Sequence, residues 1–231
     1  MGQRVLMIDL DPQGNTTSGL GMEVDDKSIY EVIMGRMKLT DVMEETEFKN
    51  LSIAGSDVRL ANAELELVEV EKREYRLKTA VQSVQQDFDF IFIDCPPSLG
   101  LLTINALGAA DSVLIPIQCE YYALEGVASL MNTISRVKKT INPHLEIEGV
   151  LLTMLDGRTN LGLQVVDEVK KHFKKQVYAT VIPRSVRLGE APSHGEPIHV
   201  YDKRSAGCVA YVNLAKEVLK RNNIKVKEFK L

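Results

Sequence analysis

Residues 4–12 read Arg-Val-Leu-Met-Ile-Asp-Leu-Asp-Pro, and this stretch sets the fold of the chain. The unbroken apolar run Val5–Ile8, which ends at acidic residues, predicts a buried parallel strand with carboxylates at its carboxyl end. Asp9 and Asp11 flank Leu10, so their side chains point to the same side of an extended chain. Two like charges on one side are costly unless a cation or hydrogen-bond donors compensate them. The stretch therefore predicts a polar site at one edge of a parallel sheet.

The rest of the chain alternates between apolar strands and helical patterns. Further strands are predicted at 51–54, 90–93, 112–117, 147–154 and 178–182. Helices are predicted at 28–34, 58–86 (broken in two), 101–109, 123–140, 161–173 and 206–221, with Thr40 as the N-cap of another short helix. This alternation indicates an α/β fold: a doubly wound, mostly parallel sheet with helices on both faces. We expect a single domain, 1–231, whose ligands bind beyond the carboxyl ends of the strands.

The composition is that of a globular protein. Of the 231 residues, 45% are apolar and 26% are charged, which excludes collagen-like, coiled-coil and disordered chains. No stretch approaches the ~18 apolar residues of a membrane span, and the early acidic residues argue against a secretory leader. Three widely spaced cysteines, Cys95, Cys119 and Cys208, exclude a disulfide framework and a paired metal site. We interpret them as buried, inert thiols.

Charge is distributed unevenly along the chain. Residues 1–135 contain 22 acidic and 10 basic side chains, whereas residues 136–231 contain 10 acidic and 18 basic ones. The basic part permits an anionic partner such as nucleic acid. A lysine-rich helix surface in contact with water explains the same excess equally well.

A second acidic strand end lies at Asp94, which follows the apolar run Phe90–Ile93. Parallel strands end at a shared edge, so we expect Asp9, Asp11 and Asp94 to converge. Hard oxygen ligands of this kind suit Mg²⁺, which takes one or two carboxylates beside substrate phosphates. An apolar strand that ends in Asp is also the Walker B pattern of P-loop NTPases, although an Asp that starts a turn after a strand is common.

Five blocks of sequence make the chain recognisable. They are DLDPQGN at 9–15 with TSGLG at 17–21, DCPPSLG at 94–100, QCEYYALEG at 118–126, LTMLDGRTN at 152–160 and IPRSVRLGEAPS at 182–193. The first resembles the Walker A′ segment of the ParA/Soj ATPases that partition chromosomes and plasmids, and the second resembles their Walker B segment. The blocks follow the family's order over essentially the whole chain, and they favour the chromosomal, Soj-like branch.

The resemblance implies an ATP hydrolase that uses Mg²⁺ on a P-loop NTPase-like fold. It gives Asp11 the catalytic role of positioning the attacking water, places Asp9 near the metal, and lets Asp94 hold Mg²⁺ through water. The alternative for Asp11 is an acid that only starts an Asx turn. The residues that the resemblance places against the nucleotide, besides Asp9 and Asp94, are Met154, Pro183 and Ser185. Many relatives have Asn at position 185.

The resemblance also implies partners. ATP-bound homodimers would coat nucleoid DNA in the cytoplasm without sequence preference, and a ParB/Spo0J-like protein would stimulate hydrolysis and release. Arg158 and Arg187 match arginines that the family uses on DNA phosphates. The alternative for each is a surface arginine paired with a neighbouring acid. A membrane relative of the MinD type would need a C-terminal amphipathic anchor, but residues 225–231 are a short segment that alternates like a strand, so we expect no membrane partner.

One family segment does not occur in residues 1–231: the K-G-G-x-G-K-T-T loop, Walker A, that cradles the phosphates. In the family a strand, this loop and a helix come before the segment that opens this chain, so we expect an N-terminally truncated domain that does not bind or hydrolyse ATP properly. A late start, a decayed gene and a genuine non-catalytic relative that binds DNA, a ParB-like protein or a complete homologue all remain open. The missing strand is central in the family. We therefore expect its neighbours to lack ladder partners, and the chain to be poorly soluble, unless the sheet closes up.

Overall fold

The computed structural model describes residues 1–121 and 125–226, and its contacts divide the chain into two compact units. We call Gly2–Asp111 with Ile134–Leu145 the N-terminal unit, and Ser112–Thr133 with Glu146–Leu231 the C-terminal unit. That the two units together form a single domain, 1–231, stays a prediction.

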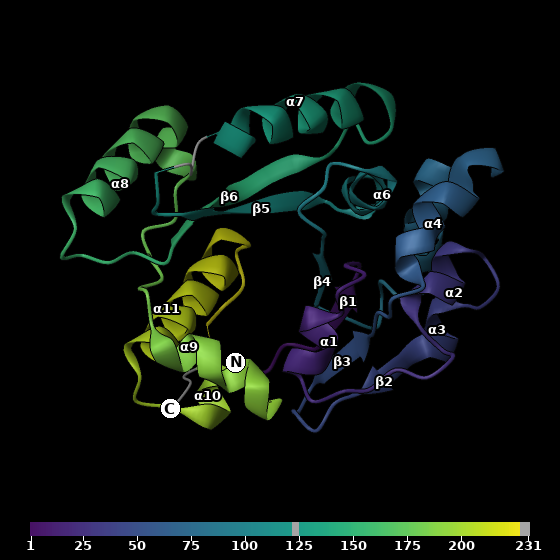
Figure 1. The fold of residues 1–231 in the computed structure, drawn as a ribbon, viewed down its shortest axis with the longest axis horizontal. Helices are drawn as coiled ribbons and strands as arrows, with labels where there is room; N and C mark the ends of the chain where they lie inside the picture. Colours follow the sequence, from purple (N-terminus) through teal and green to yellow (C-terminus); the bar gives the residue numbers. More distant parts are fainter. Residues whose placement is uncertain (122–124, 227–231) are drawn as a thin grey trace. The chain divides into compact units, whose positions relative to one another are not determined.

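A four-stranded sheet forms the centre of the N-terminal unit (Figure 1). Its strands, in order across the sheet, are β2 (Met43–Glu45), β3 (Leu51–Ala54), β1 (Val5–Asp9) and β4 (Phe90–Asp94). β1 is parallel to both of its neighbours, and the register pairs Asp9 directly with Asp94. Leu6 and Ile8 are fully buried, as expected for an apolar strand covered on its faces. The acidic residues therefore end two adjacent parallel strands, as the sequence predicts.

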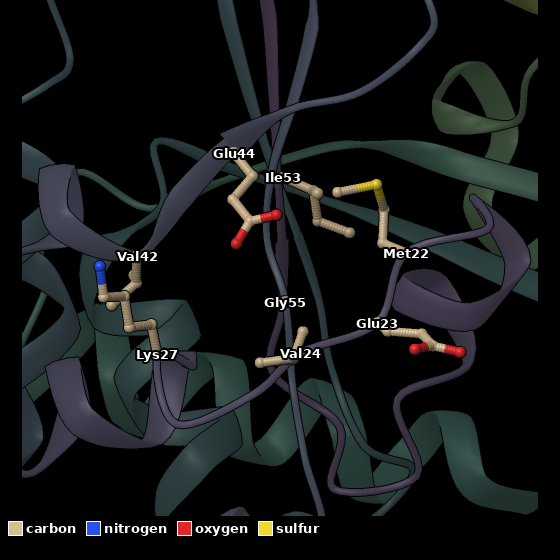
Figure 2. Close-up of a pocket in the computed structure, with 8 residues that line it drawn as sticks. All are labelled: Met22, Glu23, Val24, Lys27, Val42, Glu44, Ile53 and Gly55. Atoms are coloured by element: carbon tan, nitrogen blue, oxygen red, sulfur yellow. The ribbon is translucent and has the colours of Figure 1, made fainter.

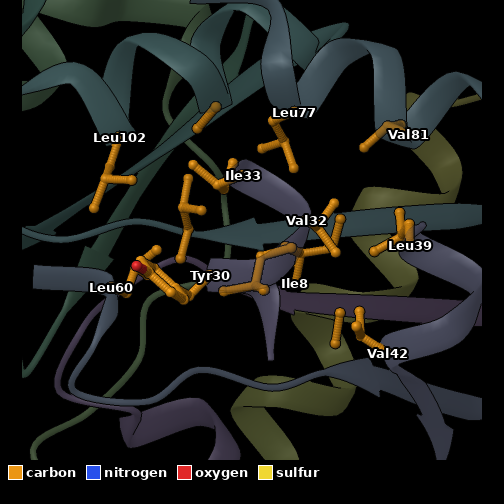
Figure 3. Close-up of a cluster of buried hydrophobic side chains, with 14 of the residues drawn as sticks. Ile8, Tyr30, Val32, Ile33, Leu39, Val42, Leu60, Leu77, Val81 and Leu102 are labelled. Carbon is orange, nitrogen blue, oxygen red and sulfur yellow. The ribbon is translucent and has the colours of Figure 1, made fainter. Parts of the chain in front are cut away.

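Short helices pack against this sheet. They are α1 (Asn15–Gly19), α2 (Ile29–Ile33), α3 (Leu39–Val42), α4 (Leu60–Glu66), η1 (Leu67–Glu69), η2 (Arg73–Tyr75), α5 (Arg76–Gln82) and α6 (Leu101–Ala109). Ile8, Ile33, Leu77 and Leu102 belong to one buried apolar cluster (Figure 3). The predicted helix over 58–86 is broken, as expected, and Lys72 between the pieces adopts the left-handed conformation (φ 54°), which a continuing helix does not permit.

The N-cap predicted at Thr40 is wrong. α3 begins at Leu39, so its N-cap is Lys38 and Thr40 lies inside the helix. The carboxylate of Asp41 accepts a hydrogen bond from the backbone N–H of Lys38 (3.3 Å). The Asp41 side chain, in the first turn, therefore accepts a hydrogen bond from the backbone N–H of the N-cap residue, which is one of the two hydrogen bonds of a capping box.

Two parallel strands form the sheet of the C-terminal unit: β5 (Ser112–Gln118) and β6 (Glu146–Thr153). Its helices are α7 (Glu125–Thr140), which runs into the N-terminal unit from Ile134 on, α8 (Asn160–Phe173), η3 (Lys174–Gln176), α9 (Val186–Glu190), η4 (Ala191–His194), α10 (Ile198–Tyr201) and α11 (Ala206–Arg221). The Thr159 and Ser205 hydroxyls cap α8 and α11. The predicted helices agree with these bounds to within two residues, and residues 123 and 124 of the predicted α7 lie outside the described residues.

The strand predicted at 178–182 is wrong. No residue of this segment lies in a strand, and isolated bridges occur only at its flanks, Val150 with Val177 and Leu155 with Pro183. The backbone N–H groups of Ala179 and Thr180 donate to the Glu217 carboxylate in α11 instead of to a strand (2.8 and 2.9 Å). Tyr178 and Ile182 donate to carbonyls of β6 (2.8 and 2.9 Å), so the side chain of a distant helix replaces the strand partner only between them, and nothing in the local pattern of 178–182 reveals it.

The described strands form two separate ladders, and β4 and β5 each pair on one side only. That these strands flank a strand missing from this chain stays a prediction. The α/β class of the chain is confirmed. Within residues 1–121 and 125–226, no helix combines the length and apolar character that crossing a bilayer requires.

Candidate nucleotide-binding site

We call the ends of β1 and β4, with Asp9, Asp11 and Asp94, the acidic edge. Asp9 is its buried member. It is fully buried, and its carboxylate accepts three hydrogen bonds: from the Thr17 hydroxyl (2.6 Å), the Thr17 backbone N–H (2.8 Å) and the Asp11 backbone N–H (3.2 Å). Burial raises the pKa of Asp9, and the charge of Asp94 raises it further, although the three hydrogen bonds act in the opposite direction. Both carboxylate oxygens are used by the protein, so Asp9 anchors α1 to the end of β1.

Asp11 starts a tight turn. Its carboxylate accepts a hydrogen bond from the Gln13 backbone N–H (2.9 Å), and its carbonyl accepts one from Gly14 (3.0 Å). Gly14 has φ 63°, a conformation that glycine adopts without strain. The Asx turn considered as an alternative is therefore present, and it leaves the half-buried carboxylate at the edge of the sheet beside Asp9. A turn and a catalytic role are compatible, because the turn fixes the direction of the side chain.

Asp94 is exposed, and its carboxylate accepts a hydrogen bond from the Thr16 hydroxyl (2.6 Å). Thr16 is a site residue that the sequence reasoning missed. The available signal was its place in the first turn of the helix that follows the acidic loop, next to the second hydroxyl of Thr17. Adjacent threonines on such a turn point to adjacent acids, which is the arrangement seen here.

The acidic edge fits part of a magnesium site. Within the described residues, no group of three or more His, Cys, Asp or Glu side chains is placed to hold a metal ion, so Asp9, Asp11 and Asp94 do not form a three-carboxylate cluster. Mg²⁺ needs only one or two carboxylates when phosphate oxygens and water complete its shell. Asp94, with an exposed carboxylate and a hydroxyl beside it, fits that demand better than Asp9, whose oxygens are already hydrogen-bonded.

Met154, Pro183 and Ser185 are brought together in the C-terminal unit. The Leu155 N–H donates to the Ile182 carbonyl (3.1 Å), and the Arg184 N–H donates to the Leu155 carbonyl (3.0 Å). The end of β6 therefore lies beside the segment that carries the other two residues. Met154 has φ 53°, a strained conformation for a side chain of its size that concentrates at functional sites.

Arg158 and Arg187 are exposed and each is paired with an acid. Two nitrogens of Arg158, which is 89% exposed, donate to the Asp156 carboxylate (2.9 and 2.7 Å). These bonds hold the pKa of Asp156 far below its ordinary value. Arg187 pairs with Glu190 (2.9 Å) and Asp202 (3.5 Å). In this structure each arginine is therefore paired with a neighbouring acid, as the alternative interpretation states. A contact of these arginines with DNA stays a prediction.

Cys95 lies next to Asp94 and is not a nucleophile near neutral pH. Burial, followed by the charges of Asp94 and Asp11, raises the pKa of its thiol to about 12.

A small cavity in the N-terminal unit is lined by Met22, Glu23, Val24, Lys27, Val42, Glu44, Ile53 and Gly55 (Figure 2). Its volume of about 10 Å³ is the space of one water molecule, so it is too small for a nucleotide.

Comparison with known proteins identifies relatives over nearly the full chain. A family model described as an AAA domain matches residues 1–147. The chain is 58% identical to the sporulation initiation inhibitor protein Soj of Bacillus subtilis, over 94% of this chain and 87% of Soj. It is 50% identical to the chromosome partitioning protein ParA of Myxococcus xanthus, over 96% of this chain and 80% of ParA.

A solved structure with nucleotide is also similar. Cobyrinic acid a,c-diamide synthase from Mycobacterium smegmatis, with bound ADP and magnesium, matches with a TM-score of 0.83 at 36% identity, over 96% of this chain and 84% of that one. The sequence blocks, the acidic edge and these relatives agree with one another. The chain therefore belongs to the ParA/Soj family of partitioning ATPases.

Proposed function

We propose that the chain acts in DNA partitioning as an ATPase of the ParA/Soj type. The observation that carries the proposal is the acidic edge of the N-terminal unit, where Asp11 and Asp94 follow paired strands and the Thr16 hydroxyl holds Asp94. The chain is 50% identical to a chromosome partitioning protein, which supports this process over other uses of nucleotide hydrolysis.

In this proposal Asp11 orients the water that attacks the terminal phosphate of ATP. Asp94 would hold Mg²⁺ through water, and Asp9 lies beside it and fixes the loop. The metal, when bound, neutralises charge on the phosphate oxygens, because phosphoryl transfer is catalysed mainly by positioning and charge stabilisation. The ADP and magnesium in the structure of the Mycobacterium smegmatis relative support a nucleotide in this family's fold.

Met154, Pro183 and Ser185 would pack against the adenine. Two backbone hydrogen bonds hold their segments together, and the positive φ of Met154 marks a conformation that the surrounding structure must maintain. These residues belong to the C-terminal unit, and the acidic edge belongs to the N-terminal unit.

Arg158 and Arg187 would bind phosphates of nucleoid DNA in an ATP-bound homodimer, and a ParB/Spo0J-like protein would stimulate hydrolysis and release. Support comes from the 18 basic side chains of residues 136–231 and from the exposure of both arginines. Contacts to phosphate need no base readout. The proposed location is the cytoplasm, on the nucleoid.

The test compares two chains: residues 1–231, and the same chain extended at its N-terminus by a family strand, K-G-G-x-G-K-T-T loop and helix. Isothermal calorimetry measures MgATP binding, and phosphate release measures hydrolysis. We expect negligible activity from residues 1–231, because the K-G-G-x-G-K-T-T loop does not occur in them, and both activities from the extended chain.

In the extended chain, Asp11→Ala should abolish turnover. Asp87→Ala is the matched control, since Asp87 is exposed and precedes β4, at the end opposite Asp94. Tight MgATP binding by residues 1–231 alone would contradict the role given to the loop. DNA or partner binding without nucleotide in either chain would favour the non-catalytic binding module instead.

A further inference from the structure

Thr17 connects three segments at the acidic edge. It is only 4% exposed, and its hydroxyl donates to Asp9 (2.6 Å) while accepting from the backbone N–H of Ser56 (3.0 Å). Its own N–H donates to the same Asp9 oxygen (2.8 Å). One hydroxyl therefore ties together the end of β1, helix α1 and the segment that follows β3.

The methyl group of Thr17 is also packed. A Cβ added to Gly55 would lie 3.0 Å from the Thr17 methyl carbon and 2.4 Å from a methyl carbon of Val24. The chain after β3 thus passes directly against Thr17, which only a residue without a side chain permits. The hydroxyl and methyl of Thr17 have separate tasks, and substitutions can remove one and keep the other.

The loop of Asp11 lies between the two ends of this linkage. Asp9 accepts the Asp11 N–H at one end (3.2 Å). At the other end, a Cβ added to Gly14 would lie 3.4 Å from the Ser56 carbonyl oxygen. The turn that carries the Asp11 carboxylate is thus bonded to Asp9 and passes close to Ser56.

We propose that Thr17 is a positioning residue for Asp11: its hydroxyl fixes Asp9 against Ser56 and so holds the Asp11 turn in the geometry that orients the attacking water. The expected effect of Thr17 on kcat rests on the proposed ATPase function. Its effect on the position of the Asp11 turn rests on the hydrogen bonds alone. Removing the hydroxyl leaves the Ser56 N–H without an acceptor and Asp9 with one donor fewer, both inside the protein.

The chain offers matched variants. Thr17→Val keeps the shape and loses the hydroxyl, whereas Thr17→Ser keeps the hydroxyl and loses the methyl. Ser56→Ala is the control, because the Ser56 hydroxyl is buried and has no hydrogen-bond partner within the described residues, and its backbone N–H is retained in alanine. It removes a hydroxyl from the same place without cutting the linkage.

Amide hydrogen exchange in residues 1–231 measures how firmly the hydrogen bonds among Thr17, Asp9 and Ser56 hold the Asp11 turn. In Thr17→Val the amides of Asp11, Gln13 and Ser56 should exchange about tenfold faster, while those of Leu6 and Ile8 in β1 keep their protection. Thr17→Ser should stay within about threefold of the unsubstituted chain, and Ser56→Ala should match it. In the extended chain, Thr17→Val should lower kcat about tenfold with KM for MgATP changed less than about twofold, and Thr17→Ser should restore kcat.

Unchanged exchange in Thr17→Val, or equal damage from Ser56→Ala, overturns the assignment. If Thr17→Val does not fold, Thr17→Ser decides: fast exchange at Asp11 in a folded Thr17→Ser chain shows that the hydroxyl does not hold the turn. If the extended chain has no ATPase activity, the proposed function fails, and the exchange data still decide whether Thr17 holds Asp11.

Discussion

The acidic edge of the N-terminal unit and the exposed arginines of the C-terminal unit, Arg158 and Arg187, hold their charges in opposite ways. Asp9 is fully buried and accepts three hydrogen bonds, whereas Arg158 is 89% exposed and is paired with the neighbouring Asp156. A buried charge that loses its partners is strongly destabilising, but an exposed ion pair contributes only about 0–1 kcal/mol. Folding therefore fixes the acidic edge, while the ion pairs of the arginines contribute little to folding.

The buried side of this contrast should be the most sensitive to substitution. Ile8, one residue before Asp9, is fully buried in the apolar cluster. Ile8→Ala should lower the free energy of unfolding by about 2–5 kcal/mol, because it opens a cavity between packed elements. Urea unfolding measures the change. Val58→Ala, at a site that is 79% exposed in the same unit, is the control. Equal effects of the two substitutions would remove the basis of the comparison.

The C-terminal unit has a half-buried carboxylate, Glu217, that is also held by several hydrogen bonds, which sharpens the contrast. Burial by itself raises the pKa of Glu217, but hydrogen bonds from Ala179 and Thr180 and the charge of Arg221 outweigh it, so the pKa lies below its ordinary value of 4.5. Glu217→Gln should lower the free energy of unfolding at neutral pH by about 1–3 kcal/mol, since two backbone donors lose an ionised acceptor.

The pH dependence has a definite sign. A carboxylate whose pKa is lowered by folding stabilises the protein above the ordinary pKa, and this contribution is lost as the pH falls through the lower, folded value. The difference between the unsubstituted chain and Glu217→Gln should therefore shrink below pH 4.5. Urea titrations at several pH values measure it, with the exposed Glu168→Gln as control. A difference that stays constant with pH would show that shape, not charge, explains the effect.

The exposed arginines should give the smallest effects. In the extended, ATP-bound chain, Arg158→Ala and Arg187→Ala should each weaken binding to any duplex and lower the salt slope by about 0.9, one phosphate contact. Asp156→Asn should strengthen binding by about two- to threefold, because it releases an exposed ion pair. Fluorescence anisotropy over a salt series measures both, with Arg4→Ala, paired with Asp89 in the N-terminal unit, as control. A change in sequence preference would point to base readout instead.

Elements stabilised by local patterns are predictable from the sequence, whereas those held by partners distant in sequence are not. β1 and β4 are short apolar runs that end at acidic residues, so the local pattern predicts both strands and the acidic edge that they share. The segment 178–182 has the same pattern, but Glu217 satisfies its backbone from a helix 37–38 residues away. No local signal reports such a partner, and the prediction therefore fails there.

The candidate site divides in the same way. The loop of Asp11 and the end of β4 are visible as motifs, whereas the hydrogen bonds of Thr16 and Thr17 depend on which strands become neighbours. Thr17 reaches Ser56 across 39 positions of sequence, a distance at which spacing carries no information. A motif thus predicts which residues react, and the structure adds which residues hold them.

The contacts of α11 also have a consequence for synthesis of the chain. The backbone groups of Gln176, Val177, Ala179 and Thr180 bond to Glu217 and Arg221, which follow them by 37–45 residues. At ribosomal rates of about 5–20 residues per second, this delay is roughly 2–9 s. During that time the segment beside β6 has its amides in water and no carboxylate to receive them. The C-terminal unit can therefore complete its fold only after α11 has left the ribosome, whereas every strand of the N-terminal unit has been made more than a hundred residues earlier.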